Sequence, residues 1–306
     1  MQVSLVTYHL SLYNKGMKYN AYIIAGPTAS GKSDAAHALA RRANGVVINC
    51  DSVQIYKGIE NISASPLADG IPADGVPYKL FSILPLSEQI GVAEYLKMAR
   101  AEYDAGVAAG KTPIFVGGTG FYISAILRGI SPIPEISTEV RARARNMVCD
   151  NPDAARKLIG GAELDPQRAA RALEVLLETG RPIAEFQALP RTGAIPGEIC
   201  KILINPPKEI IAERIAARIP KMMAGGALSE VRAAIAANWD TGRAIGAYEL
   251  AKFIGGEIDE KTAIKNWAVR TVQYAKRQRT WFRTQYDADI EINHVPTAKD
   301  LELINV

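Results

Sequence analysis

The chain has 306 residues, which is long enough for a large core or for one core with a substantial insertion. Its hydrophobic content of 48% and charged content of 22% are ordinary for a globular protein and exclude a disordered chain. The net charge of +4 is a weak signal, but seven basic residues and no acidic ones lie between positions 261 and 283. This run suits an anionic partner or, alternatively, a solvated basic helix.

The N-terminal stretch carries Lys15 and Lys18 after an apolar segment, which is the reverse order of a secretory signal peptide. It is also too short and too polar to span a bilayer. We therefore expect residues 1–20 to form a loose N-terminal extension, with Met17 as an alternative start. The three widely spaced cysteines contain no C-x-x-C pair. We expect neither a zinc ribbon nor disulfides, but a cytoplasmic protein without a membrane segment.

An apolar run at residues 21–25 leads into a glycine-rich loop, which is followed by an alanine-rich helical pattern. The loop, GPTASGKS, fits the pattern G-x-x-x-x-G-K-[ST] at every required position, and strand, loop and helix stand in the order that this pattern needs. Its backbone N–H groups and the following helix N-terminus favour phosphate oxygens. The predicted phosphate-binding residues are Gly26, Pro27, Thr28, Ala29, Ser30, Gly31, Lys32 and Ser33.

Two of these side chains add chemistry to the loop. Lys32 supplies a point charge for phosphate, and the Ser33 hydroxyl is suited to Mg²⁺. Nucleotide-binding and ATP-binding proteins use the same motif, so it predicts a diphosphate or triphosphate ligand without saying which. A glycine-rich turn with an accidental lysine is the alternative, and the order of strand, loop and helix argues against it.

A second apolar run at residues 46–50 ends at Asp51. Three roles suit an aspartate there: an acid that orders Mg²⁺, a general base, or the N-cap of a helix starting in DSVQIY. No apolar run ends in Asp-Glu or Asp-Asp, which would supply the metal and water apparatus of an ATPase. The sequence therefore favours a transferase that holds phosphates over an ATPase motor.

Strands and helices continue to alternate after Asp51. Residues 91–109 predict a helix, residues 112–120 a buried strand that ends at glycines, and residues 121–127 another helix. This alternation predicts an α/β fold with a doubly wound parallel sheet. Because ligands bind at the carboxyl ends of such strands, we expect Asp51 and the glycines at 117–120 to lie beside the phosphate loop.

The pattern changes after residue 129, where a proline-punctuated linker leads into helical segments rich in alanine and arginine. Residues 201–205 (KILIN) then resemble a return to the sheet. We therefore predict a P-loop α/β catalytic core formed by residues 21–130 and 200–290. A small helical domain, residues 131–199, is inserted into this core.

Arg214 and Arg218 lie four residues apart, and therefore on one face of a predicted helix. Either could clamp a phosphate group through its planar guanidinium. The alternative is a solvated helix face or an ion pair with Glu209 or Glu213. These residues considered alone favour that alternative.

The basic run near the C-terminal end also contains aromatic residues. Trp267, Tyr274 and Trp281 have heptad spacing, which we interpret as a buried stripe. Basic residues interleaved with aromatics can bind a nucleic-acid backbone. We therefore assign to a polyanion the basic residues on another face, namely Lys276, Arg279 and Arg283.

Seven stretches of the chain resemble, in the same order, those of the bacterial tRNA dimethylallyltransferases, also called tRNA isopentenyltransferases. Together they cover most of the chain from about residue 21 to residue 285. They are GPTASGKS (26–33), NCDSVQIYKG (49–58), PIFVGGTGFYISAIL (113–127), DPQRAARALEVLLETG (165–180), RIAARIPKMMAGGALSEV (214–231), AIGAYEL (244–250) and YAKRQRTWFR (274–283).

The resemblance implies transfer of a dimethylallyl group from dimethylallyl diphosphate to N6 of the adenosine 3′ of the anticodon, with release of diphosphate. The acceptors would be tRNAs that read codons beginning with U, and Mg²⁺ would be the cofactor, with Ser33 as a ligand. By the same resemblance Asp51 is the general base and Thr28 contacts the donor near its reacting end. Arg214 or Arg218 would neutralise the diphosphate. We expect a monomer that acts without a membrane.

The resemblance also implies that the helical insertion grips the anticodon stem-loop and that the adenosine is flipped out to reach the donor. The implied tRNA contacts are Asp51, Ser52, Val53, Gln54, Thr119, Arg141, Gln167, Arg168, Ala169, Ala170 and Arg171. The chain departs from the family at three places. Tyr78 and Lys79 stand where members commonly carry a histidine pair, residues 62–66 lack a common lysine, and the tyrosine of the common IGYKE is displaced to Tyr248.

Three other functions fit parts of this pattern. A small-molecule kinase with the same core would transfer phosphate from ATP. An isopentenyltransferase for free adenine nucleotides would not need the helical insertion and the basic run, which favour a macromolecular acceptor. An RNA-binding NTPase switch would need the acidic strand end that this sequence lacks.

Overall fold

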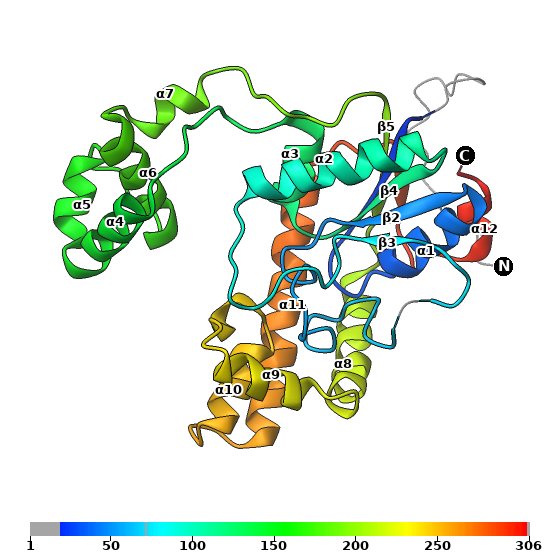
Figure 1. The fold of residues 1–306 in the computed structure, drawn as a ribbon. Coiled ribbons are helices and arrows are strands. Elements are labelled where there is room, and N and C mark those ends of the chain that lie inside the picture. The colour runs from blue at the N-terminus through cyan, green and yellow to red at the C-terminus, as the bar shows by residue number, and fades with distance from the viewer. Residues whose placement is uncertain (1–18, 71, 305–306) are drawn as a thin grey trace. The chain divides into compact units, whose positions relative to one another are not determined.

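The computed structural model describes residues 19–70 and 72–304, so the predicted extension at 1–20 lies outside the described residues except for its last two. The described chain forms two compact units (Figure 1). The core unit comprises residues 19–127 and 195–304, and the helical unit comprises residues 128–194. The sequence placed the insertion at 131–199 and ended the core at residue 290, whereas the core unit continues past that residue.

In the described residues, one parallel sheet has the strand order β3-β2-β4-β1-β5-β6. The strands are β1 (Ala21–Ala25), β2 (Gly45–Asn49), β3 (Tyr78–Lys79), β4 (Thr112–Gly117), β5 (Ile199–Ile204) and β6 (Ile290–Ile292). Every residue of β1 and β2 is buried, as expected for parallel strands covered on both faces. The predicted parallel α/β fold is confirmed. The edge strands β3 and β6 are too short to show a periodic pattern in the sequence.

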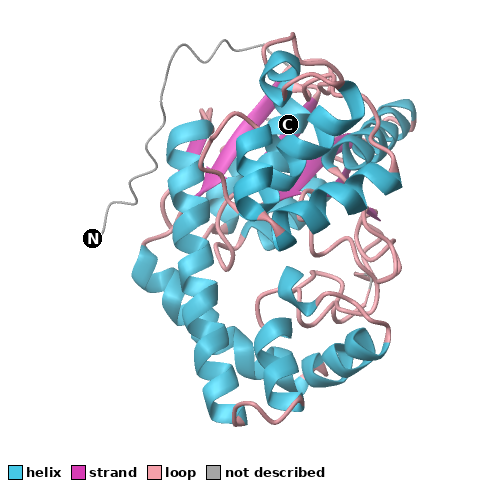
Figure 2. Cartoon of the chain, turned by 90° about the vertical axis from the view of Figure 1, so that its left-hand side faces the viewer, coloured by secondary structure: helices cyan, strands magenta, loops and turns pink. Residues whose placement is uncertain are grey.

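Helices cover both faces of this sheet (Figure 2). On one face, Leu39 of α1 packs in a cluster with Val47 and with Leu301 of α12. On the other face, Gly106 of α2 lies against Val46, whose side chain points away from that cluster because successive strand residues alternate. The helices named here are α1 (Lys32–Arg42), α2 (Val92–Ala108), α3 (Gly120–Arg128), which follows β4, and α12 (Ala298–Glu302).

A second group of helices lies beyond the carboxyl ends of the strands (Figure 1). They are α8 (Lys208–Ala224), α9 (Ala227–Ala236), the 3-10 turn η1 (Thr241–Arg243), α10 (Ala247–Ile254) and α11 (Glu260–Gln285). With 26 residues, α11 is about 39 Å long. It packs on both α8 and α10 and so holds these two helices together.

The predicted aromatic stripe on α11 is only partly right. Trp267 is buried, but Tyr274 and Trp281 are half-buried. A straight α-helix repeats every 3.6 residues, so positions spaced by seven drift away from a buried line. The buried line of α11 instead follows steps of three and four residues: Ala263, Trp267, Thr271, Ala275, Gln278 and Phe282.

The helical unit contains α4 (Thr138–Asp150), α5 (Pro152–Leu158), α6 (Pro166–Thr179) and α7 (Ile183–Gln187). Its core is small, with Ala144, Val148 and Leu173 at the centre of one cluster. Side chains at three N-caps accept backbone hydrogen bonds, among them Asp165 from Arg168 N–H at the start of α6. The side-chain N-caps satisfy backbone N–H groups at the starts of the helices, and the apolar residues of each helix lie on one face. Together these features explain why short helices form a compact unit here.

In the described part of the chain no helix is both long enough and apolar enough to cross a membrane. The three cysteines are free. Cys50 and Cys200 are buried, and burial raises the pKa of each thiol to about 12. Both therefore remain protonated at neutral pH and pack as small apolar side chains.

Candidate active site

A cavity of about 930 Å³ opens at the carboxyl ends of the strands in the core unit. Its walls come from the phosphate loop, the turn after β2, the segment from Ile62 to Pro72, and helices α8 and α11. Most residues that the sequence selected in this unit converge here. Those that line the cavity are Thr28, Ala29, Gly31, Lys32, Ser33, Asp51, Ser52, Val53, Gln54, Arg214 and Arg218.

The phosphate loop has the backbone geometry of an anion cradle. Gly31, at the N-cap of α1, has a φ of 93°, in the left-handed region that glycine adopts without strain. It offers no side-chain cap, which leaves the first N–H groups of α1 open to an anion. Gly26 approaches β5 so closely that a Cβ there would lie 2.3 Å from the carbonyl oxygen of Ile204. Gly26, Pro27 and Ser30 therefore shape the loop from inside, where they are buried.

Lys32 places its ammonium group over this loop. Its Nζ donates to the carbonyl oxygen of Pro27 at 3.3 Å. Burial lowers the pKa of Lys32 to about 8, and Asp51 offsets part of this effect. Lys32 therefore remains charged at neutral pH, although in the described residues it forms no ion pair.

Arg214 and Arg218 reach the same loop from α8. Arg214 Nε donates to the carbonyl oxygen of Ala29 at 2.8 Å, and Arg218 Nη2 donates to Thr28 Oγ1 at 3.0 Å. Neither arginine forms an ion pair within the described residues, which argues against a pair with Glu209 or Glu213. Their contacts with the phosphate loop argue against a purely solvated helix face.

Arg218 also has one N–H donor that is not used within the described residues. Its buried Nε has no hydrogen-bond partner in the described part of the chain. Burial and the nearby Arg214 lower the pKa of Arg218 to about 10, so its guanidinium is still charged at neutral pH. The nearby Asp51 carboxylate opposes this lowering of the pKa only in part, so the Arg218 guanidinium is a binding element for an anion.

Asp51 lies in a tight turn after β2. Its Oδ1 accepts hydrogen bonds from the N–H groups of Val53 at 2.9 Å and Gln54 at 3.4 Å. The predicted capping role is therefore right for one oxygen, although residues 51–54 form turns and not a helix. Oδ2 accepts no hydrogen bond within the described residues and remains for a ligand.

Sequence reasoning missed Asn49, whose side chain hydrogen-bonds to the backbone of the Asp51 turn. Its buried side chain accepts from Asp51 N–H at 2.8 Å and donates to the carbonyl oxygens of Asp51 and Leu80, each at 2.9 Å. An asparagine at the end of an otherwise apolar strand was the available signal.

Thr119 supports the same turn from the end of β4 and does not line the cavity. Its Oγ1 accepts from Ser52 N–H at 3.0 Å, and its own N–H donates to the carbonyl oxygen of Cys50 at 3.3 Å. Gln278 of α11 was also missed, although its place on the buried line of that helix marks it. It hydrogen-bonds to both Thr28 and Gly118.

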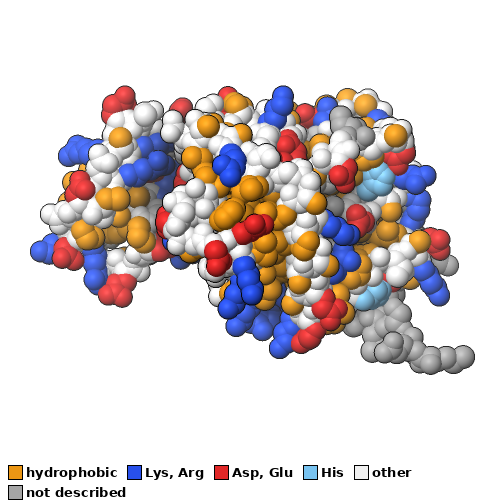
Figure 3. All heavy atoms as spheres, turned by 90° about the horizontal axis from the view of Figure 1, so that it is seen from below, with side chains coloured by type: hydrophobic (Ala, Val, Ile, Leu, Met, Phe, Trp, Pro, Cys, Tyr) orange, Lys and Arg blue, Asp and Glu red, His pale blue; other side chains and the backbone are white. Residues whose placement is uncertain are grey.

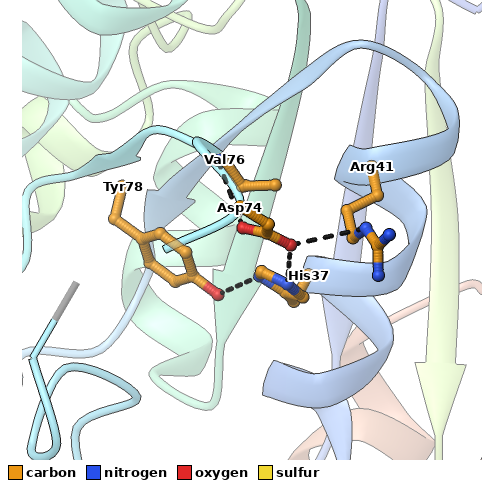
Figure 4. Close-up of polar contacts among 5 residues, drawn as sticks. All are labelled: His37, Arg41, Asp74, Val76 and Tyr78. Carbon is orange, nitrogen blue, oxygen red and sulfur yellow. Dashed lines mark hydrogen bonds and ion pairs between the residues drawn. The ribbon is translucent and has the colours of Figure 1, made fainter. Parts of the chain in front are cut away.

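The wall formed by residues 61–78 is fixed at two places. At one end, the Glu230 carboxylate of α9 accepts from the N–H groups of Asn61 and Ile62, each at 2.8 Å. At the other end, His37 of α1 lies between Asp74 and Tyr78 (Figure 4). An imidazole is therefore present beside Tyr78, contributed by a different element from the one that carries the family's histidine pair.

The proton positions in this cluster follow from its donors and acceptors. His37 Nε2 lies 2.8 Å from Asp74 Oδ2, which also faces Arg41 Nε at 3.4 Å. A carboxylate only accepts, so Nε2 donates to Asp74, and Nδ1 forms a hydrogen bond of 2.9 Å with the Tyr78 hydroxyl. Burial and the nearby Asp74 and Asp34 raise the pKa of Tyr78 to about 12, which keeps the proton of this hydroxyl in place.

The remaining predicted RNA contacts lie elsewhere. On α11, Lys276 and Arg283 are exposed, while Arg279 is half-buried and donates to the carbonyl oxygen of Pro206 at 2.9 Å. The predicted residues of the helical unit are Arg141 on α4 and Gln167, Arg168, Ala169, Ala170 and Arg171 on α6.

The members of this second set differ in their surroundings. Arg141, Gln167 and Arg168 are exposed. Ala170 is buried in the core of the helical unit. Arg171 donates to the buried Glu174 carboxylate at 3.0 Å and so also holds α6 together.

Comparison with known proteins gives one consistent result. A family model described as IPP transferase matches residues 54–285, and one described as isopentenyl transferase matches residues 19–73. The chain is 38% identical to the tRNA dimethylallyltransferase of Paramagnetospirillum magneticum over 88% of this chain and 90% of that protein. It is 40% identical to that of Acidiphilium cryptum over 89% and 86%, respectively. The crystal structure of the tRNA isopentenylpyrophosphate transferase of Bacillus halodurans matches with a TM-score of 0.65 at 26% identity, over 93% of this chain and 94% of that one.

The cluster in Figure 4 generates a prediction about the cavity wall. Asp74→Asn removes the carboxylate that both His37 and Arg41 contact. We expect the backbone amides of residues 73–76 to exchange with deuterium about two- to fivefold faster, because exposed ion pairs contribute modestly. Hydrogen-exchange mass spectrometry measures this. Asp69→Asn is the control, since Asp69 is exposed in the same segment and has no ion pair in the described residues. An equal change in both variants would contradict the assigned role of Asp74.

Proposed function

The chain belongs to the family of tRNA dimethylallyltransferases, and from this premise we propose its detailed reaction. It transfers a dimethylallyl group from dimethylallyl diphosphate to N6 of the adenosine 3′ of the anticodon, in tRNAs that read codons beginning with U. Diphosphate is the other product. The observation that carries this proposal is the convergence of the phosphate loop, two unpaired arginines and Asp51 on one cavity.

The diphosphate of the donor binds to the phosphate loop. Backbone N–H groups at the start of α1, the Lys32 ammonium and the free Nε–H of Arg218 supply donors for its oxygens. We assign the departing diphosphate to Arg218 because it has this unused donor, whereas Arg214 Nε holds the loop at Ala29. Thr28, which Arg218 contacts, lies at the reacting end of the donor. Positive charge fixed in advance stabilises the negative charge that develops as the diphosphate leaves.

Asp51 directs the acceptor. The adenine N6 is a weak nucleophile because its lone pair is delocalised into the ring, so orientation matters. The N6 lone pair forms a bond to C1 of the dimethylallyl group as the C1–O bond breaks and its electron pair leaves with the diphosphate. The N6 proton passes to Asp51 Oδ2, while Oδ1 stays bound to the turn N–H groups and fixes the carboxylate.

We propose Mg²⁺ as the cofactor, held by the Ser33 hydroxyl together with diphosphate oxygens. Within the described residues no cluster of three or more His, Cys, Asp or Glu could hold a metal by itself. Mg²⁺ commonly binds to one or two protein oxygens and to substrate phosphates, so this sparse donor set fits it. When bound, the ion offsets negative charge on the diphosphate.

The tRNA contacts follow the two units. In the core unit we assign them to the turn of Asp51, Ser52, Val53 and Gln54, with Thr119 as its support. Figure 3 shows the core unit from the side of α9 and α10, where Lys and Arg side chains gather beside exposed apolar side chains. Such a surface suits an RNA backbone and unstacked bases.

In the helical unit the exposed Arg141, Gln167 and Arg168 are the contacts we propose. Ala169, Ala170 and Arg171 act there through the shape of α6, since Ala170 is buried and Arg171 binds Glu174. We further propose that the enzyme acts as a monomer, and that it acts in the cytoplasm, where its tRNA substrate is found.

The direct test is a transfer assay with purified protein. We expect dimethylallyl diphosphate, Mg²⁺ and an unmodified tRNA that reads codons beginning with U to give tRNA heavier by one prenyl group, measured by mass spectrometry of the nucleosides. Parallel reactions contain free AMP as the acceptor, or ATP in place of the donor. Equal labelling of AMP would indicate a nucleotide isopentenyltransferase, and phosphate transfer from ATP would indicate a kinase.

Substitution of Asp51 separates its roles as base and as turn cap. Asp51→Asn keeps an Oδ1 that accepts from Val53 and Gln54 but removes the basic oxygen. We expect kcat to fall by about 10²–10⁴-fold, the usual contribution of a general base, with the Kd for tRNA within about threefold of wild type. Asp51→Ala removes both functions. If Asp51→Asn is fully active, or if transfer and tRNA binding are lost in equal measure, Asp51 is only a structural cap.

The low pKa of Lys32 predicts how donor binding depends on pH. In the free enzyme the pKa of Lys32 is about 8, and an anionic diphosphate raises it because it favours the ammonium form. Donor binding above pH 8 therefore takes up a proton. We expect the KM for the donor, measured at saturating tRNA, to be constant below about pH 8 and to rise by up to about tenfold per pH unit above it. Lys32→Met should raise this KM at every pH and remove the rise, and a wild-type profile flat to about pH 9.5 would contradict the assignment.

A further inference from the structure

We propose that Gln278, on the buried line of α11, is a positioning residue that sets the distance between the phosphate loop and the Asp51 turn. The proposal rests on the transfer reaction described above, because it concerns the alignment of that reaction's two substrates. Gln278 lies 250 residues from Thr28 in the sequence, and the residue is 5% exposed.

The carboxamide of Gln278 forms two hydrogen bonds of opposite sense. Its Oε1 accepts from Thr28 N–H at 2.8 Å, and its Nε2 donates to the carbonyl oxygen of Gly118 at 2.9 Å. One end faces an N–H and the other a C=O, so only this orientation of the amide satisfies both. A Cβ on residue 118 would lie 2.2 Å from Nε2, so the absence of a side chain at Gly118 allows this approach.

The contact at Gly118 continues to Asp51. The next residue, Thr119, accepts from Ser52 N–H at 3.0 Å and donates to the carbonyl oxygen of Cys50 at 3.3 Å. Cys50 and Ser52 are the two sequence neighbours of Asp51. A continuous path of hydrogen bonds therefore runs from Thr28 through Gln278 and the β4 turn to both sides of the base.

The strand order explains why such a connection is needed. The phosphate loop follows β1 and Asp51 follows β2, but β4 lies between these strands in the sheet. The β4 turn is bound to the Asp51 turn by Thr119, and Gln278 binds it to the phosphate loop. Reacting atoms must approach to about 3–3.5 Å, and a misplacement of about 1 Å costs about 10²-fold in rate. A residue that fixes this spacing therefore acts on kcat.

The bridge also fixes what Thr28 offers to the donor. Its N–H donates to Gln278 and its hydroxyl oxygen accepts from Arg218, so the protein fixes the direction in which the Thr28 hydroxyl can donate to the diphosphate. The amide of Gln278 is neutral, and so it performs this task without adding a charge beside the anionic diphosphate.

Gln278→Met tests the bridge because it keeps the volume of the side chain and removes both hydrogen bonds. We expect kcat to fall about 10- to 100-fold, with the KM for dimethylallyl diphosphate and the Kd for tRNA within about threefold of wild type. Gln273→Met is the matched control, an exposed glutamine on the same helix, and should leave all three values unchanged. An unchanged kcat in Gln278→Met, or a change confined to the KM for the donor, would overturn the proposal.

Gln278→Glu provides a second test that does not depend on how well the methionine variant folds. A protonated carboxyl group can accept from Thr28 N–H and donate to the Gly118 carbonyl, whereas a carboxylate cannot donate. Burial raises the pKa of such a carboxyl group above its usual value. We therefore expect the ratio of the variant's kcat to that of wild type to rise at least fivefold as pH falls from about 8 to about 5.5.

A kcat ratio that does not depend on pH would overturn the role of the bridge. Failure of the wild-type enzyme to transfer the dimethylallyl group is a different result. It would contradict the proposed function itself, whereas active wild type with active Gln278 variants contradicts only the positioning role.

Discussion

Three cations surround the phosphate loop without forming an ion pair in the described part of the chain. Arg214 donates a hydrogen bond to the loop, and the charge of Arg218 lowers the pKa of Lys32. Burial lowers the pKa of both Lys32 and Arg218. Keeping such charges together costs free energy unless an anion compensates them. In the core unit, the parallel strands and the close contacts of the loop glycines hold these charges together in spite of this cost. In the proposed function, the diphosphate of the donor supplies the missing negative charge, so binding of the donor would stabilise the site.

The frame around this charge is built from elements far apart in sequence. Arg214 and Arg218 reach the loop from α8, and Gln278 reaches it from α11. The remaining wall, residues 61–70 and 72–78, has little regular structure and is fixed by Glu230 at one end and by the His37 cluster at the other. The anion site is thus supported by rigid helices, while the wall opposite depends on a few polar contacts. This difference in support suits a cavity that must hold a small donor firmly and admit a large nucleic acid.

The departures from the family pattern have local explanations. His37 hydrogen-bonds to Tyr78 and pairs with Asp74. An imidazole therefore lies beside Tyr78 although the family's histidine pair is missing from this sequence. The displaced Tyr248 is 39% exposed and lies under two cations, with Lys252 Nζ at 5.0 Å and Arg270 Cζ at 4.7 Å from its ring centre. The neighbouring Glu249 is buried, binds Arg270 and accepts from Gly246 N–H. The third departure, at residues 62–66, lies against the Asp51 turn, since the carbonyl oxygens of Ser63 and Ala64 accept from Gln54 Nε2.

The sequence by itself determined the strand, glycine loop and helix of the phosphate site, because that motif is local and each of its positions has its own steric or hydrogen-bonding requirement. It also determined the parallel α/β fold, through the alternation of apolar runs with helical patterns. Only the tertiary structure decided which helix faces meet the loop. Helical spacing showed that Arg214 and Arg218 share a face but not what that face contacts, and taken alone it favoured the wrong answer. Asn49 and Gln278 were missed for the same reason, since the value of a buried amide depends on two backbone partners that folding brings together from distant parts of the chain.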